Sequence, residues 1–108
     1  MAEIKDKDIK KQITHFKKKV ISKYHPEEII LYGSRARGDH LLESDIDIVI
    51  VSRKFKGIKW PTRLGDVAEL WEGCIAIEPL CYTPEEFNKK KKQLGIVRQA
   101  VKEGIRLL

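Results

Sequence analysis

The sequence of 108 residues has no long apolar segment. Its longest apolar run, residues 46–51, contains Asp47 and is far shorter than the roughly 20 residues that a membrane-spanning helix needs. The first six residues, Met1–Asp6, lack the apolar core of a secretory signal peptide. We therefore expect neither a membrane span nor a signal sequence.

Cysteine is scarce, because only Cys74 and Cys81 are present. Two cysteines do not make a disulfide scaffold, and no Cys-x-x-Cys pair or Cys/His cluster indicates zinc. None of the three histidines has a partner at metal-ligand spacing. We expect two reduced thiols in a cytoplasmic protein.

Linkers and repeats are also missing, since no stretch rich in Pro, Gly or Ser divides the chain. At about 100–150 residues per domain, the length predicts one domain over residues 1–108. Apolar residues at 42% argue against disorder, although charged residues reach 35%. A net charge of +6 favours polyanionic partners, namely nucleotides, nucleic acid or acidic protein surfaces.

Helix and strand signals alternate along the chain, which predicts an α/β sandwich around a small sheet of undetermined topology. The predicted elements are a helix over residues 6–24, a strand over 29–32, a short helix over 35–37, a strand over 45–51, a helix from 61 or 62 to 72 capped by Gly73, a strand over 74–82, helices over 84–93 and 96–103, and an edge strand over 105–108. Residues 53–63, with five positive and no negative side chains, are predicted to form an exposed basic loop.

Gly33 and Ser34 stand at a predicted junction between a strand and a helix. Glycine lets a phosphate approach the backbone closely, and the free N–H groups of a helix start favour an anion. Arg35 and Arg37 add positive charge nearby. The competing interpretation is an ordinary helix cap with no ligand.

Asp45 and Asp47 are two residues apart on a predicted strand, so both carboxylates point to the same face. Their mutual repulsion would be relieved by a divalent cation, and hard oxygen ligands on a rigid strand suit Mg²⁺. Alternatively, Asp45 is a turn residue and Asp47 lies at a solvated edge.

Taken together, Gly33-Ser34, Ala36-Arg37-Gly38 and Ser44-Asp45-Ile46-Asp47 form one extended motif. This motif resembles that of the minimal nucleotidyltransferases (MNT) of the DNA polymerase beta superfamily. The resemblance spans essentially the whole chain and implies that superfamily's α/β core with a mixed sheet. It also implies ATP or another NTP as substrate, with two Mg²⁺ ions.

The superfamily uses a third carboxylate on a later strand, and Glu78 is the matching acidic residue here. The resemblance then implies that Asp45, Asp47 and Glu78 are catalytic metal ligands. Two departures bear on Glu78: many relatives have Asp, and Pro79 removes a backbone donor directly after it.

By the same resemblance, Gly33 and Ser34 would hold the β- and γ-phosphates. Arg35 or Arg37 would then neutralise the leaving pyrophosphate, and the sequence leaves open which of the two does so.

The chain is similar to small MNT proteins that pair with HEPN-domain toxins. This implies an antitoxin that moves AMP from ATP to a hydroxyl of the HEPN partner. One alternative is a catalytically silent protein that masks its partner. Another is a nucleic-acid-binding module that uses the basic segments 17–19, 53–63 and 89–92, with affinity that falls steeply with salt.

Overall fold

The computed structural model describes residues 7–33, 45–73 and 75–108. The elements are α1 (Lys7–Tyr24), β1 (Glu28–Tyr32), β2 (Ile46–Val51), the 3₁₀ helix η1 (Arg53–Phe55), α3 (Trp60–Ala68), β3 (Ile77–Tyr82), α4 (Pro84–Lys90), α5 (Ile96–Glu103) and β4 (Ile105–Arg106). The strands form one sheet in the order β3-β2-β1-β4. Since β2 pairs parallel with β3 while β1 pairs antiparallel with β2 and β4, the mixed sheet is confirmed.

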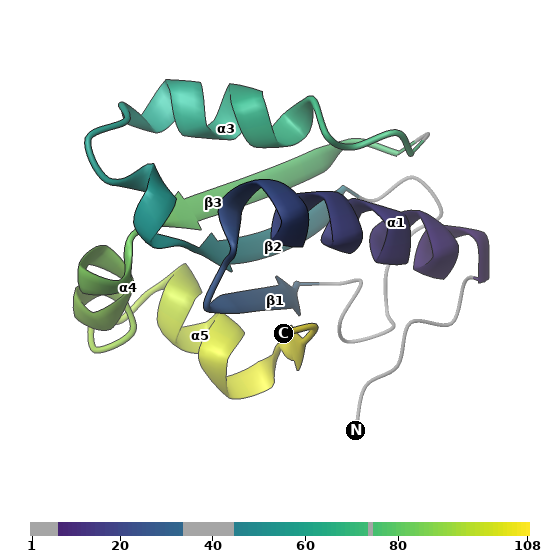
Figure 1. Cartoon of the computed structure of the whole chain (residues 1–108). Helices are drawn as coiled ribbons and strands as arrows, with labels where there is room; N and C mark the ends of the chain where they lie inside the picture. The colour runs from purple at the N-terminus through teal and green to yellow at the C-terminus, as the bar shows by residue number, and fades with distance from the viewer. Residues whose placement is uncertain (1–6, 34–44, 74) are drawn as a thin grey trace.

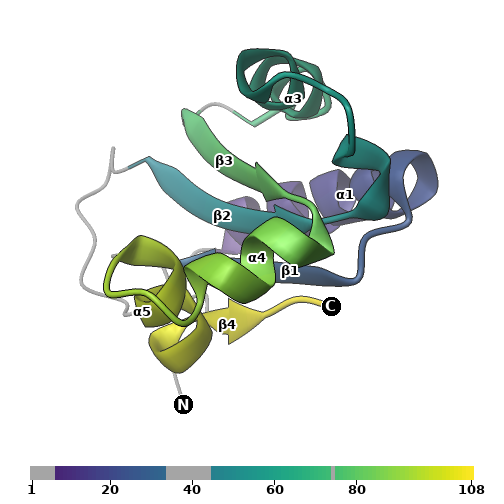
Figure 2. The same cartoon turned by 90° about the vertical axis from the view of Figure 1, so that its left-hand side faces the viewer.

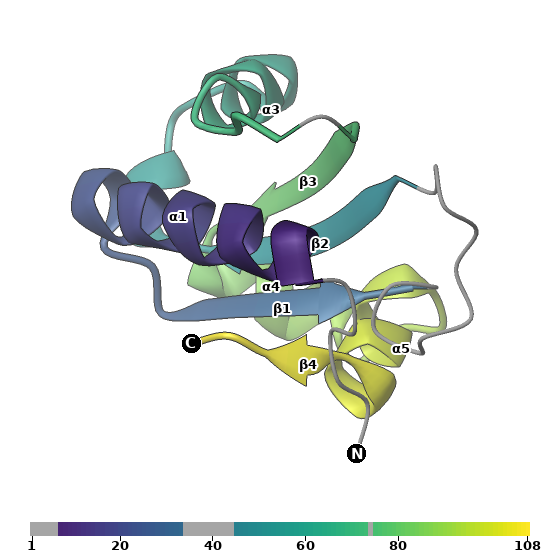
Figure 3. The same ribbon diagram turned by 90° about the vertical axis from the view of Figure 1, so that its right-hand side faces the viewer.

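Helices cover both faces of this sheet, which gives three layers. Helices α1 and α3 lie on one face, and α4 and α5 lie on the other (Figure 1), as the two side views show (Figures 2 and 3). The alternation of side chains along β2 divides the core accordingly. Ile48 and Ile50 pack with Phe16 of α1, whereas Val49 packs with Phe87 of α4.

Local sequence signals set most of the boundaries correctly. Thr83 begins α4 through a complete capping box with Glu86, and α5 begins directly after Gly95, as predicted. Helix α4 ends at Lys90, three residues earlier than expected. No helix in the described ranges is both long and apolar enough to cross a bilayer.

Pro79 occupies an edge strand, where a missing N–H group is tolerated. The N–H of Ile46 donates to the carbonyl of Ala76, and the N–H of Ser52 donates to that of Tyr82. Backbone groups alternate in direction along a strand, so the even-numbered residues of β3 bond to β2. The nitrogen of Pro79 therefore faces the outer edge, and no hydrogen bond between the strands is lost.

The prediction of an exposed basic loop over residues 53–63 is right for the exposure of most of the segment, but it missed two buried side chains and two helical stretches. Phe55 is fully buried in the core within η1, and α3 already begins at Trp60. Arg63 is also buried, because its Nη1 atom donates to the carbonyl of Cys81 at 3.1 Å and to Glu86 at 2.6 Å. Burial of an aromatic ring and pairing of the guanidinium outweigh the local charge.

The predicted end of the following helix at Gly73 is wrong, because α3 ends at Ala68. Trp71 packs its ring edge-on against Phe16, and its indole N–H donates to the carbonyl of Ile75 at 2.6 Å. This packing directs the chain away from the helix axis. The third strand then begins at Ile77 rather than at residue 74.

Candidate active site

Three polar side chains meet where β1, β2 and β3 lie side by side. In the strand register, Asp47 of β2 stands opposite Tyr32 of β1 on one side and opposite Glu78 of β3 on the other. Residues in register point to the same face of a sheet, here the face that α4 and α5 cover further along. Asp47 and Tyr32 are half-buried, whereas Glu78 is exposed.

Glu78 lies in a concentration of negative charge. Its pKa is raised above the ordinary value of 4.5, first by its hydrogen-bonding contact with Asp47, then by burial and by the charge of Asp47. Asp45, just before β2, adds a hydrogen-bonding contact and its charge in the same direction. Both aspartates therefore lie within interaction range of Glu78, and the repulsion between the carboxylates disfavours ionisation of Glu78.

Tyr32 belongs to the same cluster. Burial, followed by the charge of Asp47, raises the pKa of its phenol far above the ordinary value of 10. Tyr32 therefore stays neutral and can donate a hydrogen bond. No sequence motif marks Tyr32, because only the register of β1 against β2 brings it next to Asp47.

Gly33, directly after β1, approaches the Asp47 carboxylate closely. Its φ is +77°, in the left-handed region, and a Cβ atom there would lie 2.6 Å from Oδ2 of Asp47. Any side chain would therefore displace this carboxylate or move the backbone. The absence of a Cβ at Gly33 keeps the carboxylate and the end of β1 in contact.

The donor set has the chemistry that Mg²⁺ requires. Carboxylate oxygens are its usual protein ligands, and one or two carboxylates with substrate phosphates suffice. As the side chains stand, no three His, Cys, Asp or Glu residues among those described are grouped as a complete metal site. The convergence of Asp47 and Glu78, with Asp45 acting on the latter, fits a metal that is bound together with a triphosphate.

The structure thus brings together four of the predicted site residues, Asp45, Asp47, Glu78 and Gly33. Ser34, Arg35 and Arg37 lie outside the described residues, as does the short helix predicted around them.

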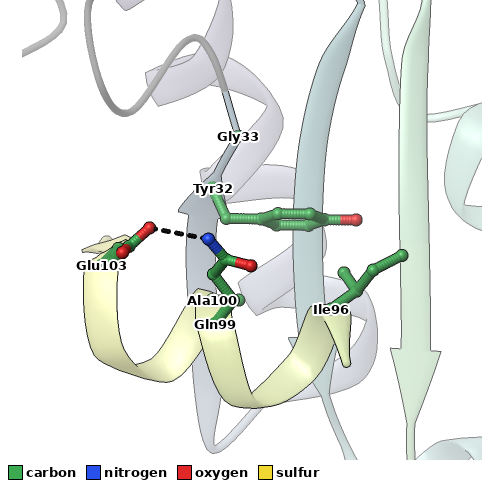
Figure 4. A pocket seen from close by; sticks show the side chains of 6 residues that line it. All are labelled: Tyr32, Gly33, Ile96, Gln99, Ala100 and Glu103. Carbon is green, nitrogen blue, oxygen red and sulfur yellow. Dashed lines mark hydrogen bonds between the residues drawn. The ribbon is translucent and has the colours of Figure 1, made fainter. Parts of the chain in front are cut away.

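A pocket beside this cluster was not foreseen. It lies between Tyr32, Gly33 and helix α5 (Figure 4), and no motif marked the residues that α5 contributes.

Comparison with known proteins identifies the family to which this fold and motif belong. Residues 9–107 match the family model of the nucleotidyltransferase domain. A Methanocaldococcus jannaschii protein named "Putative protein adenylyltransferase MJ0141" is 34% identical in an alignment 74 residues long, which covers 65% of this chain and 75% of that protein.

Among solved structures, one described as "a putative nucleotidyltransferase from Sulfolobus solfataricus" has 28% identity and a TM-score of 0.58, over 91% of this chain and 83% of that one. BolA1 from Arabidopsis thaliana shares the fold alone, at 21% identity and a TM-score of 0.57, over 69% of this chain and 94% of its own. The family match over residues 9–107 confirms the resemblance seen in the motif, and the chain belongs to the nucleotidyltransferase domain family.

Proposed function

We propose that this protein is a Mg²⁺-dependent adenylyltransferase that moves AMP from ATP to a hydroxyl group of a partner protein. The observation that carries the proposal is the convergence of Asp45, Asp47 and Glu78 beside Gly33. Nucleotidyl transfer follows from the family, and the similarity to the protein named "Putative protein adenylyltransferase MJ0141" supports AMP and a protein acceptor.

In this proposal, Asp45, Asp47 and Glu78 hold the metal. Bound there, Mg²⁺ would neutralise phosphate charge and lower the pKa of the acceptor hydroxyl. Gly33 leaves room for the triphosphate at the end of β1.

The reaction replaces a phosphoanhydride bond of ATP with a phosphoester bond to the acceptor. The acceptor oxygen attacks the α-phosphorus and loses its proton, the bond between the α-phosphorus and the bridging oxygen breaks, and pyrophosphate leaves. For the acceptor, we propose a small helical partner of the HEPN type, with this chain as its antitoxin, as the resemblance implies. Ser34, Arg35 and Arg37 belong to the proposal as ligands of the phosphates.

Transfer of label from α-labelled ATP into the co-purified partner protein tests the proposal. We expect Asp47→Asn and Glu78→Gln to lower the initial rate by about a hundredfold, since metal stabilisation of the transition state amounts to several kcal/mol. Asp66→Asn is the matched control, because Asp66 lies on α3, across the sheet from the site. Its rate should equal that of the wild type.

The competing function is a silent protein that masks its partner. If Asp47→Asn neutralises the partner as well as the wild type does, and neither protein transfers label, masking is correct and the transferase proposal is wrong.

A further inference from the structure

A cavity of about 180 Å³ opens next to the carboxylate cluster. Its described lining consists of Tyr32 and Gly33 from the end of β1, and Ile96, Gln99, Ala100 and Glu103 from α5. Figure 4 shows the Tyr32 ring extending from the strand toward Ile96, with Gln99 and Glu103 further along the helix. Because Gly33 also contacts Asp47, the cavity and the carboxylates share a border.

The lining residues of α5 form one stripe, since they are spaced at three, four and seven residues from Ile96. The stripe is apolar where Ile96 and Ala100 face the Tyr32 ring, and polar where Gln99 and Glu103 lie. A flat aromatic ligand fits the first part, because it can stack on the phenol ring. The second part supplies hydrogen-bonding groups for the edge of that ligand.

Gln99 is exposed on α5, and its amide nitrogen donates to Glu103, one turn further along the helix, at 3.1 Å. A primary amide has two N–H donors and one acceptor oxygen, so this bond leaves one donor and the oxygen for a ligand. That pair matches adenine, which offers an amino donor next to a ring-nitrogen acceptor. At the corresponding edge, formed by O6 and N7, guanine offers two acceptors, and the amide oxygen would find no donor there.

The size of the cavity also limits the ligand. Pockets for drug-sized molecules occupy about 300–1,000 Å³, so a volume of about 180 Å³ suits one ring system rather than a peptide segment. We propose that this cavity binds the adenine base of the nucleotide, with Tyr32 as the stacking surface and Gln99 as the residue that selects adenine over guanine. The inference rests on the proposed function, because it assigns the base of the same ATP.

Nucleosides test the base pocket without phosphate or metal. We expect adenosine to give saturation-transfer NMR signals at its base protons with the wild type, and guanosine to bind at least about tenfold more weakly. Gln99→Ala should weaken adenosine binding by about tenfold and abolish the preference. Gln93→Ala is the matched control, since Gln93 is exposed between α4 and α5 and lies outside the lining, and it should change nothing.

Equal binding of adenosine and guanosine, no adenosine signal, or unchanged adenosine binding in Gln99→Ala would each overturn the base pocket. Calorimetry with tripolyphosphate and Mg²⁺ tests the phosphate site separately, using Asp47→Asn. Tripolyphosphate binding that depends on Asp47, with no base selectivity, refutes the pocket and leaves the proposed function standing. Adenosine binding that depends on Gln99, without tripolyphosphate binding, supports the pocket and counts against the proposed function.

Discussion

Replacing Gly33 with alanine separates backbone strain from damage to the site, because the chain contains a matched glycine. Gly33 and Gly57 have nearly the same φ, +77° and +79°, both in the left-handed region. A Cβ atom at Gly57, in the turn between η1 and α3, would meet nothing within 4 Å. At Gly33 it would lie 2.6 Å from Oδ2 of Asp47, about 0.8 Å short of the 3.4 Å at which ordinary contact begins.

The two substitutions should therefore cost similar strain but differ in activity. A left-handed alanine costs about 1–2 kcal/mol, so both variants should melt some degrees below the wild type. Only Gly33→Ala also has to move the Asp47 carboxylate or the backbone beside it. A misplacement on the order of 1 Å can cost about a hundredfold in rate, which is the loss we expect for label transfer from α-labelled ATP.

Thermal melting measures the strain, and the initial rate of label transfer measures the site. Gly57→Ala should retain the wild-type rate at a temperature where both variants are folded. If Gly33→Ala transfers label within twofold of Gly57→Ala, the close approach of Gly33 to Asp47 does not matter for the reaction, and the geometric argument is wrong.

Arg63→Met should destabilise the protein by about 2–4 kcal/mol in denaturant unfolding, because it leaves the buried carbonyl of Cys81 without its donor and breaks the ion pair with Glu86. Arg53→Ala removes an exposed ion pair with Glu27 and should lower the free energy of unfolding by less than about 1 kcal/mol. An equal loss in Arg63→Met and Arg53→Ala would contradict this account. Burial raises the pKa of Glu86, but bonds from Arg63 and Thr83 outweigh it and hold this pKa below 4.5. The wild type should therefore exceed Arg63→Met in free energy of unfolding by the full difference above about pH 4.5, and this difference should shrink as the pH falls through the lowered pKa. A difference that is independent of pH would refute this. Burial raises the pKa of the Cys81 thiol to about 12. Iodoacetamide at about pH 8 should therefore modify this thiol only after the protein unfolds, which mass spectrometry can measure. Rapid modification of Cys81 in the native protein would contradict the prediction.

The elements that the sequence predicted well depend on neighbouring residues. The capping box at Thr83 and the helix start after Gly95 are interactions within one turn, so their residue types suffice to locate them. The two buried side chains within residues 53–63 were missed for the opposite reason. The burial of Phe55 and the bond from Arg63 to the carbonyl of Cys81 join segments far apart in the chain, and charge counting along the sequence does not contain that information.

The same division applies to the site. Asp45 and Asp47 are found from a spacing of two, because the period of a strand follows from the backbone itself. The neighbours of Asp47 across the sheet depend on register, which places Tyr32 on one side and Glu78 on the other. Sequence alone identified Glu78 through the family resemblance, and it gave no indication of Tyr32 or of Gln99 on α5.

At the third carboxylate, the sequence departs from the family pattern in two ways: Glu78 stands where many relatives have Asp, and Pro79 follows it. The position of β3 at the edge of the sheet accounts for both. An edge strand tolerates Pro79, because the nitrogen of this residue faces away from β2. Glu78 is exposed on the same strand, yet it interacts with Asp47 strongly enough to raise its own pKa. The longer side chain therefore reaches the carboxylate cluster from this edge. Pro79 accordingly removes no hydrogen bond between β3 and β2, and the activity of Glu78→Asp would show whether the extra methylene group of Glu78 is needed for that reach.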